Sequence, residues 1–290
     1  GAGNEYSQTA RLWVVHQQNV SMRGKLECVL ELQGVWGLLR DRILRLGNPP
    51  FYSKFYTTDT IYDIISAILT DTGFSLDALG TQDDSIIDAL QPAFDVNPES
   101  MREFEDAGSV IYRLMQMTYC YLRPKPSLAF KIMYPQAADS VERTYNSDSA
   151  PFFLEYSERK NVTIPNHIYL PYNASPDGSW VEVPSVAEAE DATWSAGYTD
   201  VPLVALASRL TTAGDANSRA DVILKRIIAE QVLGRGIIPH DCGLELFDRV
   251  NFQDNRTSTT FPSYNLARVG GLVHRYAPGV YQLEVTLGGI

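Results

Sequence analysis

The chain has 290 residues, of which 44% are hydrophobic, and its 24 basic and 35 acidic residues leave a formal net charge of −11. This length can bury a substantial core and predicts about two domains of roughly 100–200 residues each. A surface of this charge repels phosphate backbones, so we expect no specific binding of nucleic acid. The apolar runs are shorter than the ~20 residues of a membrane-spanning helix, which predicts a soluble chain without membrane insertion.

The first residues and the cysteines bear on the compartment of the protein. Residues 1–5 contain neither Met nor a charged-then-apolar leader, so we expect the native N-terminus to be missing. The cysteines are Cys28, Cys120 and Cys242, with no CxxC pair. Such an odd and sparse set favours a reducing compartment, and we expect three buried or half-buried free thiols.

The N-terminal region has the period of a β-strand. Residues 25–33 alternate, with Leu26, Cys28, Leu30 and Leu32 on one side and charged or amide side chains on the other. This period predicts a half-buried strand, and residues 10–15 predict a strand before it. About fifty residues are too few for a closed barrel, so we expect missing upstream strands or later strands to complete it.

Two helices are expected in the next hundred residues. Apolar residues recur at helical spacing over residues 61–69, and Gly73 stands where a glycine ends a helix. A second helix is predicted over residues 109–119, before Pro124 and Pro126. Residues 128–134 then alternate as a strand.

The region beyond is expected to begin at a domain boundary. Residues 136–149 are polar and suit such a boundary, and residues 152–156 and 166–172 are predicted strands. Residues 173–199 contain Pro-Asp-Gly and several acidic residues, which indicates a long acidic loop.

The last third combines a helix, a glycine break and a hairpin. A helix is predicted over residues 215–233 with Asp215 as its N-cap, ended by Gly234 and Gly236. Residues 244–252 keep strand alternation. Pro278 and Gly279 predict a tight turn that pairs residues 272–276 with 280–287, and two glycines at 270–271 indicate a bulge or close backbone approach.

Two constellations invite a chemical interpretation. His240, Asp241 and Cys242 have the residue types of an activated thiol. Neighbours in sequence rarely point at one another, so we favour a turn before a strand. The second constellation is acidic, in residues 180–191, and its members with their flanking tryptophans are Glu188, Glu190, Asp191, Trp180 and Trp194.

The acidic constellation is the best enzymatic candidate, because paired carboxylates beside aromatic platforms are typical of sugar-cleaving sites. A charged, aromatic loop is more often a solvated rim or a subunit contact, and we favour that interpretation. The four histidines are far apart, at 16, 167, 240 and 274, and no HxH, HExxH, GxSxG or phosphate-binding glycine motif occurs. We therefore expect no metal, no cofactor and no catalytic residues.

The order of these elements resembles the tail-hub proteins of long-tailed phages and related contractile injection systems, the baseplate hub and late control protein D group. The resemblance runs through the strand-to-helix entry at 25–39, the helix at 60–69, the helix-to-strand unit at 109–134, and the later strands, helix and terminal hairpin. It implies an α+β fold with two antiparallel β-barrel-like domains and a helical α/β insert. The expected divisions are 1–56 for the first barrel, 57–150 for the insert and 151–290 for the second barrel.

The resemblance also implies a function and partners. It indicates a non-enzymatic structural hub that forms a homotrimer between the tail tube or distal tail protein and a central spike or tape-measure protein. The location would be the virion tail, assembled in the bacterial host cytoplasm, in a phage or prophage late protein. Two alternatives stay open: a tail-associated cell-wall or peptide hydrolase, and a carbohydrate-binding module that uses the 16 Tyr and 4 Trp.

Overall fold

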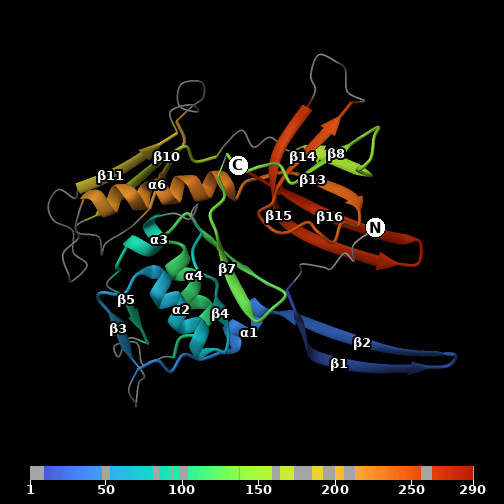
Figure 1. Ribbon diagram of the computed structural model, residues 1–290, viewed down its shortest axis with the longest axis horizontal. Helices are drawn as coiled ribbons and strands as arrows, with labels where there is room; N and C mark the ends of the chain where they lie inside the picture. The colour runs from blue at the N-terminus through green and yellow to red at the C-terminus, as the bar shows by residue number, and fades with distance from the viewer. Residues whose placement is uncertain are drawn as a thin grey trace. The chain divides into compact units, whose positions relative to one another are not determined.

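The computed structural model shows an α+β protein that divides into two compact units, Gly1–Tyr134 and Pro135–Ile290 (Figure 1). The structure describes residues 10–47, 53–80, 85–92, 94–97, 104–136, 138–158, 164–172, 185–191, 200–205, 213–255 and 263–289. Among these residues, no helix is long and apolar enough to cross a membrane.

The first unit contains short sheets and a group of helices. Its strands are β1 (Leu12–Met22), β2 (Lys25–Gly34), β3 (Lys54–Tyr56), β4 (Ser75–Leu76), β5 (Phe94–Val96), β6 (Tyr121–Pro124) and β7 (Ala129–Met133). Its helices are α1 (Val35–Asp41), α2 (Ile61–Asp71), α3 (Ser85–Ala89) and α4 (Ala107–Met115). The described strands form the pairs β1–β2 and β3–β5 and a three-stranded sheet in the order β4–β7–β6.

The expected N-terminal strands are confirmed as a long antiparallel ribbon of β1 and β2, joined at Gly24 with φ +78°. The expectation that β2 is half-buried is wrong. Leu26, Leu30 and Leu32 are all exposed, and so is Cys28, which was expected to be sheltered. Strand alternation shows which side chains share a face, but burial requires another layer against that face.

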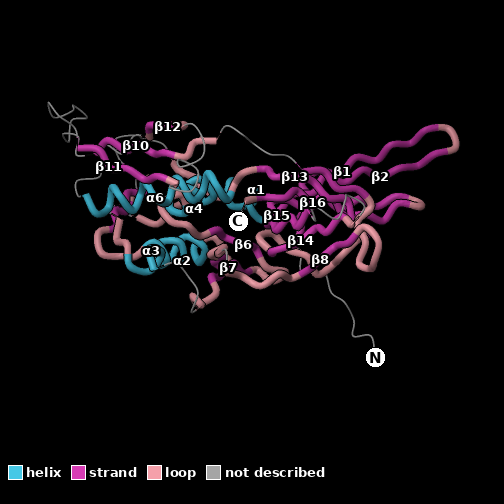
Figure 2. The backbone as a smooth tube through the Cα atoms, turned by 90° about the horizontal axis from the view of Figure 1, so that it is seen from above, coloured by secondary structure: helices cyan, strands magenta, loops and turns pink. Residues whose placement is uncertain are grey.

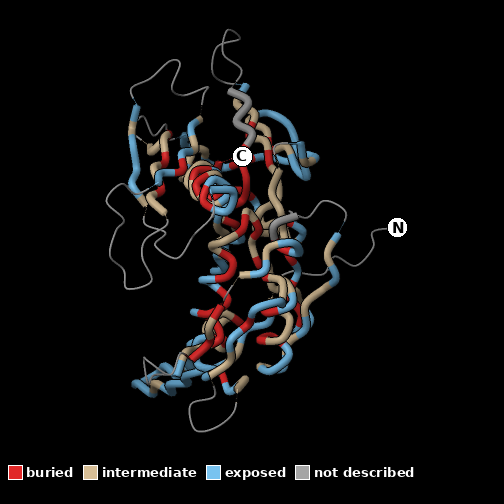
Figure 3. The backbone as a smooth tube through the Cα atoms, turned by 90° about the vertical axis from the view of Figure 1, so that its left-hand side faces the viewer, coloured by how far each residue is buried: buried red, intermediate tan, exposed pale blue. Residues whose placement is uncertain are grey.

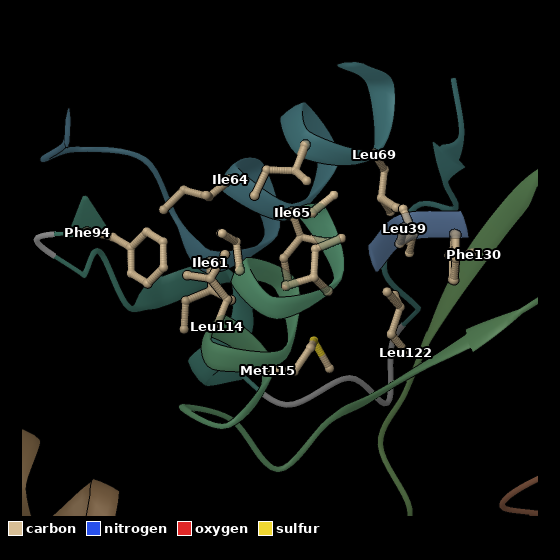
Figure 4. Packing of buried hydrophobic residues seen from close by; sticks show 14 of the residues in the cluster. Leu39, Ile61, Ile64, Ile65, Leu69, Phe94, Leu114, Met115, Leu122 and Phe130 are labelled. Atoms are coloured by element: carbon tan, nitrogen blue, oxygen red, sulfur yellow. The ribbon is translucent and has the colours of Figure 1, made fainter. Parts of the chain in front are cut away.

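Helix α2 confirms the predicted amphipathic helix of residues 61–69. Thr60 and Asp63 form a reciprocal capping box at its start, where Thr60 Oγ1 accepts from the Asp63 N–H at 3.1 Å. Gly73, with φ +85°, follows its last turn as expected. The apolar face of α2 lies in the core of the unit, where Ile61 lies beside Leu114 and Leu69 lies beside Leu39 (Figure 4).

The second expected helix is present but ends earlier than predicted. Helix α4 begins after the N-cap Asp106, whose carboxylate accepts from the Ser109 N–H at 2.8 Å, and it stops at Met115. The buried Thr118 Oγ1 donates to the Met115 carbonyl and accepts from the Cys120 N–H, which forms a turn there. That turn leads into β6, a strand that the residue pattern did not predict. The strand expected at 128–134 is confirmed as β7.

The second unit holds a large curled sheet and a smaller sheet with one helix. Its strands are β8 (Arg143–Asn146), β9 (Glu155–Glu158), β10 (His167–Tyr172), β11 (Ser185–Glu190), β12 (Pro202–Val204), β13 (Val232–Pro239), β14 (Arg249–Asp254), β15 (Ser263–Ala277) and β16 (Val280–Gly288), and its helix is α6 (Ala213–Ala229). The larger sheet has the order β8–β14–β15–β16–β13–β9 and curls into a half-barrel (Figure 2).

The terminal hairpin confirms its prediction from sequence. β15 and β16 pair antiparallel up to Ala277 and Val280, and Gly279 has φ +78° in the turn between them. The register shifts between Val269 and Gly271, so the expected bulge at the paired glycines is confirmed too.

Strand β13 corrects the prediction that Gly234 and Gly236 break the chain after the helix. Both glycines lie inside this strand, between β16 and β9. A Cβ at Gly234 would lie 2.3 Å from the Ser157 carbonyl oxygen, and one at Gly236 would lie 2.5 Å from Phe252 Cζ. The glycines therefore allow close approach within the half-barrel rather than ending an element.

The strand expected over residues 244–252 begins only with β14, at Arg249. Residues before it form a turn, in which the Glu245 N–H donates to Asp248 Oδ2 at 2.8 Å and Phe247 has φ +70°. Leu244 is nevertheless buried in the same core as Val250, so its apolar character reflects packing without strand structure.

The polar stretch expected as a boundary is attached to the half-barrel. It contributes β8, which pairs in parallel with β14. The buried Arg268 also donates to Asp139 Oδ2 at 2.8 Å and to the carbonyl of Gln136. Polar groups of this stretch accept hydrogen bonds from a buried arginine. A sequence pattern does not distinguish such a stretch from a solvated linker, because both are polar.

Helix α6 covers the three-stranded sheet β11–β10–β12. Ala216, Ala220 and Leu224 of the helix pack against Ile168 and other buried residues of the sheet. The predicted helix is confirmed, although it begins at Ala213, so that Asp215 lies inside the first turn instead of capping it. Figure 3 shows buried residues in both units.

Strand β11 corrects the expectation of a continuous acidic loop over residues 173–199. Ala187 turns inward in this strand, under α6, while its glutamates turn outward. Trp180 and Trp194 lie outside the described residues.

Candidate functional site

The outer face of the β11–β10–β12 sheet gathers an imidazole, a phenol and carboxylates. His167 and Tyr169 of β10 lie opposite Glu190 and Glu188 of β11, so all four side chains share the face that α6 does not cover. His167 Nε2 is 3.6 Å from Glu188 Oε2, and His167 Nδ1 is 3.4 Å from an oxygen of Asp200. We call His167, Tyr169, Glu188, Glu190 and Asp200 the outer cluster.

Within the outer cluster, the two aromatic rings are stacked with centroids 4.1 Å apart. The hydroxyl of Tyr169 lies 3.2 Å from His167 Nδ1. Partial burial and then the charges of Asp200, Glu188 and Glu190 raise the pKa of Tyr169, because a phenolate beside carboxylates is disfavoured. Tyr169 therefore stays a neutral hydrogen-bonding group at ordinary pH.

The outer cluster contains only part of the predicted acidic constellation. Glu188 and Glu190 share a face. Asp191 instead follows the last residue of β11, and its backbone N–H donates to the Asn166 carbonyl at 3.0 Å. The residue pattern did not join His167, Tyr169 or Asp200 to these glutamates. The alternation of His167 and Tyr169 in a predicted strand was an available signal, but their partners depend on the pairing of β10 with β11 and β12.

The outer cluster has the chemistry of a binding rim. Its carboxylates are more than half exposed at Glu188 and Asp200, while the His167 side chain is 13% exposed. Exposed carboxylates around one imidazole accept hydrogen bonds and attract cations, and they interact weakly with each other through water. This arrangement suits contact with a polar or basic surface.

The second predicted constellation does bring a thiol to an imidazole. Cys242 Sγ lies 3.4 Å from His240 Nδ1, so the expectation that these side chains point apart is wrong. The turn expected there is present. The imidazole also contacts two groups of β15 through its other nitrogen: His274 Nδ1 at 2.9 Å and the Tyr276 hydroxyl at 2.5 Å.

Asp241 does not orient the His240 ring. Its carboxylate accepts from the Tyr145 hydroxyl at 3.0 Å and from the Gly243 N–H at 2.9 Å, and it lies 3.4 Å from Arg143 Nε. A thiol–imidazole pair needs an acid or carbonyl on the other ring nitrogen to hold one tautomer for catalysis. Here that nitrogen meets an imidazole and a phenol, so the geometry is that of a polar network.

The surroundings shift the pKa values of two groups near His240. Burial, and then the charge of His240, lower the pKa of His274, because a second imidazolium so close to the first is disfavoured. Burial and the neighbouring Asp241 raise the pKa of Tyr145 well above its ordinary range. In the part of the chain that the structure describes, no group of three or more His, Cys, Asp or Glu side chains converges to hold a metal ion.

Comparisons with known proteins give a fold. No family model matches the chain, and no curated protein matches its sequence. Among solved structures, the chain is similar to the tail protein from Neisseria meningitidis MC58, with a TM-score of 0.63 and 11% identity over 96% of this chain and 79% of that one.

Two further solved structures give the same result. The prophage MuSo2 43 kDa tail protein from Shewanella oneidensis has a TM-score of 0.66 and 12% identity over 94% of this chain and 77% of that one. Prophage tail protein gp18 from Listeria monocytogenes EGD-e has a TM-score of 0.59 and 12% identity over 98% of this chain and 78% of that one. The chain has the fold of phage tail proteins.

Proposed function

We propose that this protein is a structural tail hub of a long-tailed phage or a phage-like injection system. The observation that carries the proposal is the similarity of fold over 94% or more of the chain to three proteins described as tail or prophage tail proteins. The outer cluster and the His240 network support a structural role, because neither has a nucleophile, an oriented base and an orienting acid together.

In this proposal three copies form a ring that connects the tail tube to a central spike and passes DNA or an effector. Residues 1–56 and 151–290 would supply two barrel-like domains per copy, separated by the insert of residues 57–150. Two such domains in each of three copies would present near-sixfold symmetry to the tube and threefold symmetry to the spike. The half-barrel of the second unit and the two-stranded ribbon of the first are the parts available for these domains.

The proposed partners are the tail tube or distal tail protein on one side and the spike or tape-measure protein on the other. The protein would reside in the virion tail after assembly in the bacterial cytoplasm. A net charge of −11 supports a hub that lets nucleic acid pass without retaining it.

The test is the mass of the purified full chain by light scattering, with class averages of particles by electron microscopy. The hub proposal expects three times the 32.3 kDa chain mass and a threefold ring. A single-chain mass at high protein concentration, or a closed particle with another symmetry, would overturn the trimer.

A further inference from the structure

The β1–β2 ribbon has two chemically different faces. The register pairs Val14 with Leu32 and Ser21 with Leu26, and residues that pair in this way lie on the same side of the ribbon. One side, here called the uncharged face, contains Leu12, Val14, Leu26, Cys28, Leu30 and Leu32 together with hydroxyl and amide side chains. The opposite side carries Lys25, Glu27 and Glu31.

The opposite face, and not the uncharged face, anchors the ribbon to its own unit. Trp13, which pairs with Gln33 on that side, packs against the core of the first unit. On the uncharged face, by contrast, Leu26 is 81% exposed and the side chains of Leu30 and Leu32 are about half exposed. The ribbon extends from α1 as two long strands (Figure 1).

This exposure is unfavourable for an isolated ribbon. A lone two-stranded hairpin is marginally stable in water and ordinarily needs a third strand or a packed layer. In the described part of the chain, β1 and β2 form a sheet of their own, so their outer edges have no further strand partner there. An exposed row of apolar side chains beside uncharged polar ones, as on this face, is typical of an interaction site.

We propose that the uncharged face of the ribbon is the binding site for a second copy of this chain. Two copies that each carry a net charge of −11 repel one another, which favours contact through surfaces without acidic groups. The uncharged face has no formal charge along its five residue pairs, although acidic residues outnumber basic ones over the whole chain.

The face is too small for a single stable interface and suits a contact that is repeated between several copies. At roughly 3.3 Å per residue and about 10 Å of width, one face of the ribbon covers on the order of 300 Å². Each partner contributes about 800 Å² to a standard stable interface, so this face alone would hold a partner weakly. In a closed ring every copy makes this contact with one neighbour and accepts it from the other, so the weak contacts of all copies together stabilise the ring. The inference rests on the proposed function, because it names an interface within the proposed oligomer.

Adjacent residues of β2 provide a matched test. Leu30 and Val29 are 49% and 51% exposed and lie on the uncharged and the opposite face, respectively. In the full chain, Leu30→Glu is expected to weaken association at least about tenfold, because it places a carboxylate in an apolar contact. Val29→Glu adds the same charge to the same strand and is expected to leave the mass in solution unchanged.

A native thiol gives a second measurement that needs no disruptive variant. Cys28 is exposed on the uncharged face of the single chain. Its reaction with a maleimide is expected to slow as protein concentration rises, whereas the thiol in a Cys28→Ser, Val29→Cys variant is expected to react at a constant rate. Mass spectrometry of peptides separates Cys28 from Cys120 and Cys242.

The outcomes separate this inference from the hub proposal. If the wild type forms a trimer that Leu30→Glu leaves intact, and Cys28 reacts as fast in the trimer as in dilute protein, the copies contact one another elsewhere and the hub proposal stands. If Leu30→Glu dissociates an oligomer that is not a trimer, the proposed contact at the uncharged face stands and the trimer is overturned. A wild type that stays a single chain, with constant Cys28 reactivity at all concentrations, overturns both.

Discussion

His240 Nε2 lies 2.9 Å from His274 Nδ1, although β16 lies between the strands that lead to the two residues. The two imidazoles share one hydrogen bond. The Tyr276 hydroxyl contacts the same nitrogen of His240, and the Cys242 thiol contacts the other nitrogen. Each neutral imidazole carries one N–H, and one of these N–H groups can serve the contact. Protonation of both rings would place two like charges in one partly buried place.

The first prediction is a loss of stability at low pH. The folded pKa of His274 lies below its ordinary value of 6.5. Its stabilising contribution is therefore complete above that value and is lost as pH falls toward the folded pKa, where the unfolded chain binds the additional proton. Thermal unfolding followed from about pH 7.5 to about pH 5 is expected to show a falling Tm.

The matching variant is His274→Gln, with His16→Gln on the exposed ribbon as control. His274→Gln is expected to reduce the slope of Tm against pH, while His16→Gln keeps the slope of the wild type. Equal slopes in all three proteins would show that His274 does not contribute to the pH dependence.

A second prediction concerns close packing at β13. Gly236→Ala places a Cβ at 2.5 Å from Phe252 Cζ in a filled core, and overpacking of this kind is expected to reduce the free energy of unfolding by about 1–3 kcal/mol. Gly214→Ala in α6 is the control, because a Cβ there meets no atom within 4 Å. Urea titration of both variants measures the difference. Equal stability of Gly236→Ala and the wild type would contradict the described packing.

A third prediction tests the start of α2. Thr60→Ala removes the acceptor of the Asp63 N–H and is expected to cost about 1 kcal/mol of stability. Thr58→Ala, at a nearby exposed position, is expected to stay within about 0.5 kcal/mol of the wild type. Chemical unfolding decides between them, and similar losses in the two variants would argue against a capping box.

The fourth prediction addresses the enzymatic alternative. The hub proposal expects no release of soluble fragments from purified peptidoglycan by the wild type, and no change with Glu188→Gln or Glu190→Gln. Cleavage by the wild type that either substitution abolishes would establish the hydrolase instead. The free energy of unfolding of each variant is the control for correct folding. The Glu188 side chain is 58% exposed, and its contact with His167 is expected to contribute less than about 1 kcal/mol, so Glu188→Gln is expected to fold like the wild type.

The fifth prediction concerns the charge of the assembled ring. The acidic surplus of the chain is expected to line the central channel, since negative walls do not retain phosphate. Electron microscopy of the oligomer, followed by mapping of its charged side chains, checks this distribution. A basic or neutral bore would refute it, even around a confirmed trimer.

Features that depend on neighbouring residues were predictable from sequence. Helix α2 follows from its apolar spacing, and the terminal hairpin follows from Pro278 and Gly279, because a helix period and a turn conformation are properties of a few adjacent residues. The acidic stretch of residues 173–199 was predicted as one long loop. Its strand β11 was missed, because the inward side chains, Ala187 and Ala189, are small and its partner β10 lies some twenty residues away.

Contacts between distant segments were decided by the tertiary structure. Gly234 and Gly236 resemble a helix break in sequence, yet Ser157 and Phe252 lie against them in the sheet. The same holds for His240 with His274 and for His167 with Glu188, which meet through strand pairing. The alternation of β2 determined by itself that Leu26, Cys28, Leu30 and Leu32 share one face. Whether that face is covered depends on which layer packs there, and the described residues of this chain leave it exposed because Trp13 anchors the ribbon through its other side.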